Sequence, residues 1–243
     1  MKKYILLLGV LLFLQGCSGV EDDFGNGCVS DCTVINGHFV TAGNVPLGNV
    51  RLELDFHNSS MFSSVTRNIV SERTGDDGFY SMGFYIKDNE LAGATEGFFR
   101  LQADFRGLDM DRYIVHAPVT FIDYLDISSR DTIIERTFYV PTKATIKVNL
   151  SNFNPVALGD SFRVFSSFPS GAKVEDGFLE TDYQGSGFGI FAEDVLNQTI
   201  SVVVAERETN VIKIHKNKNG VVTTEEFELY VPEHNAIVLN YNY

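Results

Sequence analysis

Hydrophobic and polar residues alternate along most of this chain, and no long amphipathic helical stripe interrupts them. The alternation is clearest in residues 49–56, 99–105, 145–150 and 237–243. Side chains on a strand point in turn to the two faces of a sheet, so this period predicts strands with one buried and one hydrated face. The pattern therefore predicts an all-β chain of short strands and glycine-rich turns, arranged as Greek-key sandwiches.

The strongest local signal is a hairpin. Asn219-Gly220 separates residues 211–216 from Val221–Val231, and this dipeptide favours the two-residue turn in which both positions have positive φ. Helical signals are few. Residues 192–198 fit a short helical turn, and residues 87–94 are ambiguous.

Roughly 210 residues of patterned sequence are large for one sandwich and comfortable for two. Proline cannot donate to a central ladder, so Pro141 marks a junction. We expect a signal peptide at 1–16, an acidic and glycine-rich tether at 17–32, and sandwiches at 33–141 and 142–243. Three short motifs of the first half have a similar counterpart in the second half, in the same order. One of these pairs is Phe138-Tyr139-Val140-Pro141 and Leu229-Tyr230-Val231-Pro232. Duplication and chance similarity explain these pairs equally well.

The N-terminus has the layout of a secretory signal peptide. Lys2-Lys3 precede an apolar run over residues 4–14, which is shorter than the roughly 20 residues of a membrane span. Leu14-Gln15-Gly16-Cys17 resembles the lipobox of bacterial lipoproteins. That resemblance implies that Cys17 receives a diacylglycerol after cleavage and anchors the chain in a membrane. An ordinary signal peptide cut elsewhere is the alternative.

Residues 18–31 show no periodicity, so we expect a disordered tether after the lipid. The cluster Glu21-Asp22-Asp23 resembles the signal that sends some Gram-negative lipoproteins to the outer surface, and a solvated spacer is the other interpretation. We therefore expect a lipid-anchored outer-membrane protein exposed at the surface, with the periplasmic face as the alternative.

Of the 3 cysteines, Cys28 and Cys32 remain once Cys17 carries the lipid. An even pair in an oxidising compartment favours a disulfide, with a turn between the two residues bringing them into range. Free thiols are the alternative. A metal site is a weaker interpretation, because structural zinc needs four ligands and only His38 lies nearby.

The charge is strongly acidic. The formal net charge is −13, and loss of Lys2 and Lys3 leaves 17 basic residues against 32 acidic ones. Such a chain is repelled by nucleic acid, so nucleic-acid binding is not expected.

Three motifs in the first half resemble the carboxypeptidase regulatory-like, or transthyretin-like, β-sandwich family. They are Gly37-His38-Phe39-Val40, the run from Val45-Pro46-Leu47-Gly48 into an alternating strand, and Thr74-Gly75-Asp76-Asp77-Gly78-Phe79. The resemblance covers residues 33–140. It implies a transthyretin-like or immunoglobulin-like sandwich that serves as an accessory module without catalytic residues of its own.

No residue pattern predicts a catalytic site, a metal or a cofactor. The histidines lack metal-binding spacing, the serines lack a nucleophile elbow, and the glycine-rich segment 185–189 lacks the helix that cradles phosphate. Asp76-Asp77 and Asp109-Met110-Asp111 could contact calcium, but acidic turns are more often solvated. Asp131-Thr132-Ile133 resembles a bacterial O-glycosylation site.

These features together favour a non-catalytic surface lipoprotein that binds or assembles with partners, which would be a surface protein complex or a glycan. A glycan-binding accessory of a polysaccharide-uptake system is the first alternative. Tyr241, Tyr243 and residues 79–85 are its candidate aromatic platforms, although core packing explains most of them. An adhesin or pilus-associated subunit and a hydrolase are less favoured.

Overall fold

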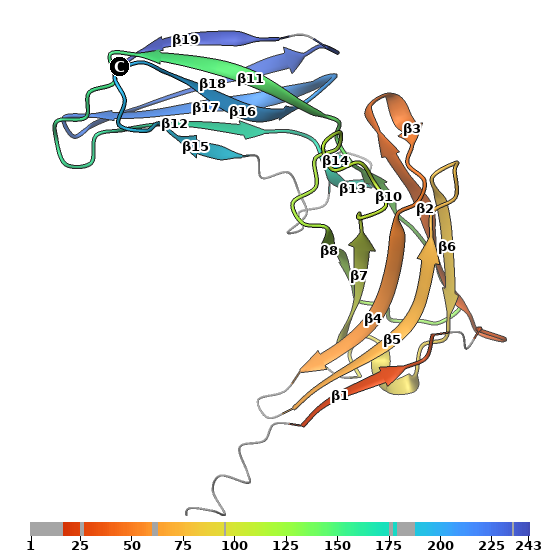
Figure 1. The fold of residues 1–243 in the computed structure, drawn as a ribbon. Coiled ribbons are helices and arrows are strands. Elements are labelled where there is room, and N and C mark those ends of the chain that lie inside the picture. Colours follow the sequence, from red (N-terminus) through yellow and green to blue (C-terminus); the bar gives the residue numbers. More distant parts are fainter. Residues whose placement is uncertain are drawn as a thin grey trace, which may run out of the picture.

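The computed structural model describes residues 17–24, 27–59, 63–94, 96–174, 177–178, 188–234 and 236–243. The predicted signal peptide at 1–16 lies outside them. The regular secondary structure of the described chain is strand, apart from two short 3-10 turns at Ala42–Asn44 and Asp88–Glu90. Figure 1 shows two β lobes that meet at an angle. The predicted all-β class is confirmed.

The first lobe consists of two facing sheets. One has the order β1-β5-β4-β7-β8, and β2 is central to the other, where it pairs with β3, β6, β9 and β10. The strands of the first sheet are β1 (Cys17–Asp22), β4 (Arg51–Ser59), β5 (Ser63–Arg73), β7 (Phe98–Asp104) and β8 (Val119–Leu125). Within the described residues the second sheet has seven strands, of which the part of the chain before Pro141 supplies β2 (Thr33–Thr41), β3 (Val45–Pro46), β6 (Phe79–Phe84), β9 (Ile133–Glu135) and β10 (Thr137–Tyr139).

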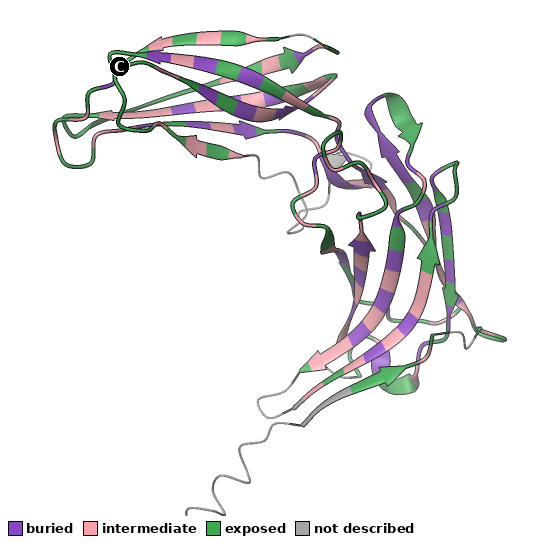
Figure 2. Cartoon of the chain, viewed as in Figure 1, coloured by how far each residue is buried: buried purple, intermediate pink, exposed green. Residues whose placement is uncertain are grey.

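The core of the first lobe lies between these sheets and follows the predicted alternation. Leu52, Leu54 and Phe56 of β4 are buried, as are Phe99 and Leu101 of β7. The resulting alternation of buried and more exposed residues along each strand is visible in Figure 2. The strands predicted at 49–56 and 99–105 are therefore confirmed.

Gly37 explains why the second sheet can change partner along β2. β9 pairs with β2 before this glycine and β10 pairs with it afterwards, both in parallel. Between them the carbonyl oxygen of Arg136 comes so close that a Cβ on Gly37 would lie 1.8 Å from it. Only a residue without a side chain fits there.

The second lobe is also a pair of facing sheets, with orders β16-β11-β19 and β15-β12-β17-β18. Its strands are β11 (Lys143–Ser151), β12 (Ser161–Ser167), β15 (Gly189–Phe191), β16 (Gln198–Ala205), β17 (Glu208–Lys218), β18 (Val221–Val231) and β19 (Val238–Asn242). A second core fills the space between them, including Ile146, Phe162 and Val202. The strands predicted at 145–150 and 237–243 are confirmed by β11 and β19.

The Asn219-Gly220 hairpin is confirmed. β17 and β18 pair antiparallel from Glu208↔Val231 to Lys218↔Val221, and the two turn residues have φ of 52° and 76°. The helical turn predicted at 192–198 is wrong, since this segment is irregular up to the start of β16. Gln198 closes it instead, with its side chain bonded to the carbonyl groups of Glu193 and Val195. The ambiguous segment 87–94 contains only the 3-10 turn Asp88–Glu90.

The two lobes are joined by more than the chain passing through Pro141. β13 (Gly171–Val174) and β14 (Gly177–Phe178) come after β12 in sequence, yet β13 pairs with β10 of the first lobe. Ala172 of β13 is fully buried in the first core. A small third cluster of Ile114, Phe168 and Ala205 bridges the junction. The division at residues 141 and 142 stays a prediction, and a strand from beyond it completes the first lobe's sheet.

Candidate functional site: the N-terminal strand and an aromatic sheet face

The segment expected to be a disordered tether begins instead with a strand, and that expectation is corrected here. β1 runs parallel to β5 in register from Cys17↔Ser63 to Asp22↔Asn68. Without β1 the outer edge of β5 would carry unpaired backbone groups, and β1 satisfies its own backbone on that edge despite having few apolar residues. Of Cys17 itself the structure describes only the backbone, which lies at the start of this strand.

A buried arginine holds the segment in place. The guanidinium of Arg67 on β5 donates to both carboxylate oxygens of Glu90 and to Asp23, at 3.0 Å from Asp23 Oδ2. The Arg67 and Glu90 side chains are only 6% and 4% exposed. Burial opposes the charged guanidinium, but the bonds to Glu90 and Asp23 outweigh that and raise the pKa of Arg67. Nearer the start of β1, Glu21 pairs with Lys87 at 2.8 Å.

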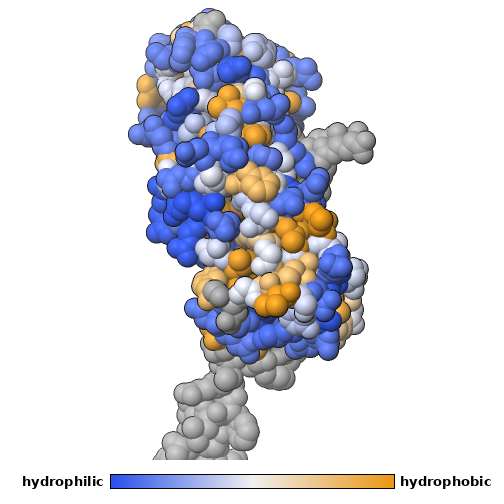
Figure 3. Space-filling view, turned by 90° about the vertical axis from the view of Figure 1, so that its right-hand side faces the viewer, coloured by the Kyte–Doolittle hydropathy of each residue, from blue (hydrophilic) through white to orange (hydrophobic). Residues whose placement is uncertain are grey.

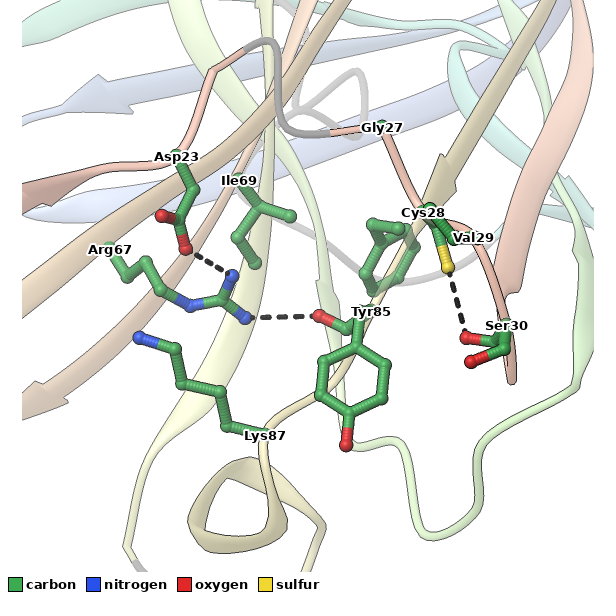
Figure 4. Close-up of a pocket in the computed structure, with 10 residues that line it drawn as sticks. Asp23, Gly27, Cys28, Val29, Ser30, Arg67, Ile69, Tyr85 and Lys87 are labelled. Atoms are coloured by element: carbon green, nitrogen blue, oxygen red, sulfur yellow. Dashed lines mark hydrogen bonds and ion pairs between the residues drawn. The ribbon is translucent and has the colours of Figure 1, made fainter.

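A disulfide joins Cys28 and Cys32, whose Cα atoms are 5.7 Å apart. Between the disulfide and Arg67 lies an open cavity of about 290 Å³, shown in Figure 4. Arg67 points into it beside Asp23 and the carbonyl of Tyr85, with Lys87 at its rim (Figure 4). Because the charged groups here are already paired with one another, this cavity is better explained as the seat of the N-terminal segment than as a ligand site.

A second feature lies on the solvent side of β4, β7 and β8, which we call the aromatic sheet face. It consists of Asp55, His57, Phe98, Arg100, Phe121 and Tyr124. On β4 and β7 these residues alternate with core residues such as Phe56 and Phe99, so they point away from the core. On β8, an irregularity in the pairing with β7 between Leu101 and Gln102 places both Phe121 and Tyr124 opposite outward-facing residues of β7. The solvent face of such a sheet is normally polar. Here three aromatic rings share it, and Tyr124 is 41% exposed.

The rings of the aromatic sheet face form a connected group. Phe98 lies 5.7 Å from His57 and 5.8 Å from Tyr124 between ring centroids, and Tyr124 lies 6.1 Å from Phe121. The guanidinium of Arg100 sits 4.6 Å above the centroid of Phe121, a favourable cation–π position. The group therefore spans three strands and combines apolar ring surface with charge.

Polar atoms lie beside these rings. Arg100 Nε donates to Asp55 Oδ1 at 2.7 Å. Within the described part of the chain, no hydrogen bond occupies the two Nη groups of Arg100 or Oδ2 of Asp55. His57 shares a hydrogen bond of 3.0 Å with Thr66. Partial burial and the nearby Arg100 charge lower the pKa of His57, so its imidazole is neutral at neutral pH.

The aromatic residues singled out from the sequence take up different roles. Tyr243 is buried against Phe153 at 4.7 Å and its hydroxyl donates to the carbonyl of Asn217. Tyr241 packs on Phe162 at 5.8 Å, and burial with the nearby Glu225 raises its pKa to about 12. Both belong to the second core rather than to a platform.

In residues 79–85 the alternation decides which rings are accessible. Tyr80, Met82 and Phe84 are buried, whereas Phe79 and Tyr85 are partly exposed. Phe79 contacts His38 and Tyr85 lies under the Arg130 guanidinium. The face that carries β2, β3 and β6 shows hydrophobic residues gathered over part of the first lobe in Figure 3. Its exposed hydrophobic residues include Val45, Phe79, Tyr85 and Ile133.

The acidic turns considered for calcium use their carboxylates locally. Asp77 accepts from the backbone N–H of Phe79, and Asp109 accepts from that of Asp111. Among the described residues, no group of three or more histidine, cysteine, aspartate or glutamate side chains is placed to hold a metal ion. Most of the glycine-rich segment 185–189 lies outside those residues. Thr132 of the proposed glycosylation motif bonds with Ser129 in a turn.

A larger cavity of about 440 Å³ opens where the lobes meet. Its lining mixes both charge signs and comes from both lobes: Thr41, Ala42, Val45, Arg112, Thr142, Lys143, Glu206, Arg207, Glu233 and His234. Next to the junction, the hydroxyl of Tyr139 donates to Glu208. Burial and that carboxylate raise the pKa of Tyr139, so it stays a neutral donor. At the cavity itself, the hydroxyls of Thr41 and Thr142 share a hydrogen bond of 3.1 Å and the backbone N–H of Lys143 donates to the carbonyl of Arg112 at 2.8 Å, so polar contacts connect the lobes here.

The sequence did not predict the aromatic sheet face or the buried Arg67. One signal was available for the first: Phe98 precedes Phe99, so one of the two must point away from the core. No sequence signal marks Arg67, because its partners Glu90 and Asp23 are distant along the chain and meet it only in the fold.

Among the residues that the structure describes, no helix reaches the length and apolar character that crossing a membrane requires. No family model and no curated protein sequence matches this chain.

Several solved bacterial proteins show a distant structural similarity. The TIE protein of Bacillus anthracis has 10% identity and a TM-score of 0.30. The similarity covers 87% of this chain, which spans about a third (33%) of the TIE protein's chain. A variant of BcpA, the major pilin subunit of Bacillus cereus, has 12% identity and a TM-score of 0.28, covering 83% of this chain and 69% of its own. The shaft pilin SpaA of Lactobacillus rhamnosus GG has 8% identity and a TM-score of 0.28, covering 87% and 96%. At these TM-scores the similarity carries no argument about function.

Proposed function

We propose that this chain is a lipid-anchored, non-catalytic binding module at the outer membrane of a Gram-negative bacterium, exposed at the cell surface. The observation that carries the proposal is the continuity between Cys17 and the fold. β1 starts at Cys17 and is paired with β5 along its length. A lipid on this residue would hold the first lobe close to the membrane rather than on a long flexible tether.

The first lobe would act as a carboxypeptidase regulatory-like accessory domain, as the resemblance of its motifs implies. Its ligand would be a glycan or a component of a surface protein complex. The specific observation that favours a glycan is the aromatic sheet face, because partly exposed rings beside the Arg100–Asp55 pair offer stacking surface and hydrogen-bonding groups together.

The anchoring part is tested with Cys17→Ser in the original host. Wild-type protein should sediment with membranes and incorporate an alkyne-labelled fatty acid, whereas Cys17→Ser should lose the label and leave the membrane fraction. A Cys28→Ser/Cys32→Ser variant is the control and should still be labelled. Failure of the wild type to incorporate label would contradict lipid anchoring.

Exposure at the cell surface is tested separately. Added protease should degrade the wild-type protein on intact cells while a periplasmic marker survives. If degradation requires prior disruption of the outer membrane, the protein faces the periplasm instead.

A further inference from the structure

We propose that the aromatic sheet face of β4, β7 and β8 binds a neutral pyranose ring of a polysaccharide. The inference rests on the proposed function only in treating this chain as a binding module, and it does not depend on the lipid. The proposed sugar site lies on the first lobe and contains none of the aromatic residues that the sequence suggested, which were Tyr241, Tyr243 and residues 79–85.

Keeping the rings of the aromatic sheet face partly exposed to water is unfavourable. Phe98, Phe121 and Tyr124 lie on the solvent side of the sheet while the core beneath is filled by Phe99, Leu101 and Ile122. They form one connected group across two strands, so they are not scattered surface residues of the kind that needs no explanation. Ring faces carry partial negative charge, which suits the C–H groups on one side of a pyranose.

A pair of polar side chains lies beside the rings. A sugar hydroxyl both donates and accepts a hydrogen bond, so neighbouring hydroxyls are matched by a donor and an acceptor lying side by side. Arg100 and Asp55 provide this pair at 2.7 Å. In the described part of the chain, the Nη groups of Arg100 and Oδ2 of Asp55 have no hydrogen-bond partner. Their ion pair is mostly shielded, at 18% and 14% side-chain exposure, which fixes its geometry before a ligand arrives.

The charge of the aromatic sheet face also favours a neutral ligand. Arg100 is paired with Asp55 and His57 is neutral at neutral pH, so the face has no net charge of its own. The chain as a whole is acidic, at −13, which disfavours anionic ligands at long range. A neutral sugar therefore fits this surface better than a uronic acid or a phosphate.

The test is native affinity electrophoresis of the full chain, purified in detergent, in gels containing xylan, mannan, laminarin, amylopectin or no polysaccharide. We expect at least one polysaccharide to retard the wild-type protein. Tyr124→Ala and Arg100→Ala should each weaken this retardation by about tenfold or more, as loss of a central contact does. Asp55→Asn keeps the side-chain shape and should also weaken binding, because it replaces an acceptor oxygen with a donor.

Phe191→Ala is the matched control. Phe191 on the second lobe is 56% exposed, and the Arg163 guanidinium lies 3.9 Å from the centroid of its ring. This pair resembles Phe121 and Arg100 but lies outside the aromatic sheet face. The substitution should leave retardation unchanged. Thermal melts check that every variant is folded.

Three results would overturn the proposal: no retardation of the wild type by any of the polysaccharides, unchanged retardation of folded Tyr124→Ala and Arg100→Ala, or an equal loss in Phe191→Ala. Lipid attachment is scored by cell fractionation and sugar binding by the gels, so either can fail without the other.

Discussion

At the scale of single residues, the ion pair between Arg67 and Glu90 is the most demanding feature of the molecule. Both side chains are almost fully buried, and each is an expensive charge unless the other is present. The pair links β5 to the 3-10 turn Asp88–Glu90, while Asp23 extends it to the N-terminal segment. One buried guanidinium thus connects the edge of the sheet with the residues that follow Cys17.

Removing Glu90 should therefore be costly. We expect Glu90→Ala to lower the free energy of unfolding by about 3 kcal/mol, near the lower end for breaking a buried pair, because Asp23 still contacts Arg67. Urea denaturation measures this change. Glu135→Ala, at an exposed position on β9, is the control and should change stability by less than about 0.5 kcal/mol. A similar effect for the two variants would contradict the role assigned to Glu90.

The exposed pair of Asp104 and Arg106 makes a prediction about pH. Hydrogen bonds from the Arg106 side chain lower the pKa of Asp104 to about 2, from an ordinary value of 3.8. A carboxyl whose pKa is lower in the folded state stabilises the fold at pH above its unfolded value and stops doing so as pH falls through its folded value. Arg106→Ala should thus be slightly less stable than wild type at pH 7.

The difference between Arg106→Ala and wild type should shrink between pH 4 and pH 2, and thermal melts of both proteins across that range measure it. A difference that stays constant down to pH 2 would show that Arg106 acts through packing instead of through the charge of Asp104.

At the scale of secondary-structure elements, the β17–β18 hairpin depends on its two-residue turn. Gly220 has φ of 76°, and a Cβ there would meet nothing within 4 Å. An alanine would therefore fit sterically but would strain the backbone, and we expect Gly220→Ala to cost about 1 kcal/mol of stability.

Gly83 on β6 is the matched control for Gly220. It too has open space around its Cβ position, but without a left-handed φ. Gly83→Ala should be neutral or stabilising by up to about 1 kcal/mol, because it restricts the unfolded chain. Denaturation curves compare the two variants, and equal destabilisation would mean that backbone strain at the turn is not the cause.

Local patterns predicted these elements well, and the structure shows where such patterns stop being informative. The alternation in 49–56 and the Asn219-Gly220 turn are set by neighbouring residues, so both could be predicted. β1 could not, because its acidic sequence has little strand propensity and its pairing depends on the free edge of β5. The same holds for the aromatic sheet face, where residues from β4, β7 and β8 become neighbours only after the strands pair.

At the scale of the whole molecule, the two lobes are coupled through elements that cross the expected boundary. β13 follows β12 of the second lobe but pairs with β10, and Ala172 is buried in the first core. The cluster of Ile114, Phe168 and Ala205 adds apolar contact at the same junction. Because β13 belongs to the sheet of the first lobe and the junction cluster buries residues between the lobes, we expect the lobes to unfold together rather than as independent domains.

Phe168 offers a direct test of this coupling, since it is 7% exposed within the junction cluster and its ring also contacts Phe188. Phe168→Ala should lower stability by about 3 kcal/mol, in the range for truncating a buried phenylalanine. Because the lost contacts lie between the lobes, calorimetry should show one transition for the wild type and two for the variant. Phe191→Ala, far more exposed, should keep a single transition at the wild-type temperature. If Phe168→Ala melts in one transition at a lower temperature, the pairing of β13 with β10 is sufficient to couple the lobes and the apolar cluster contributes stability alone.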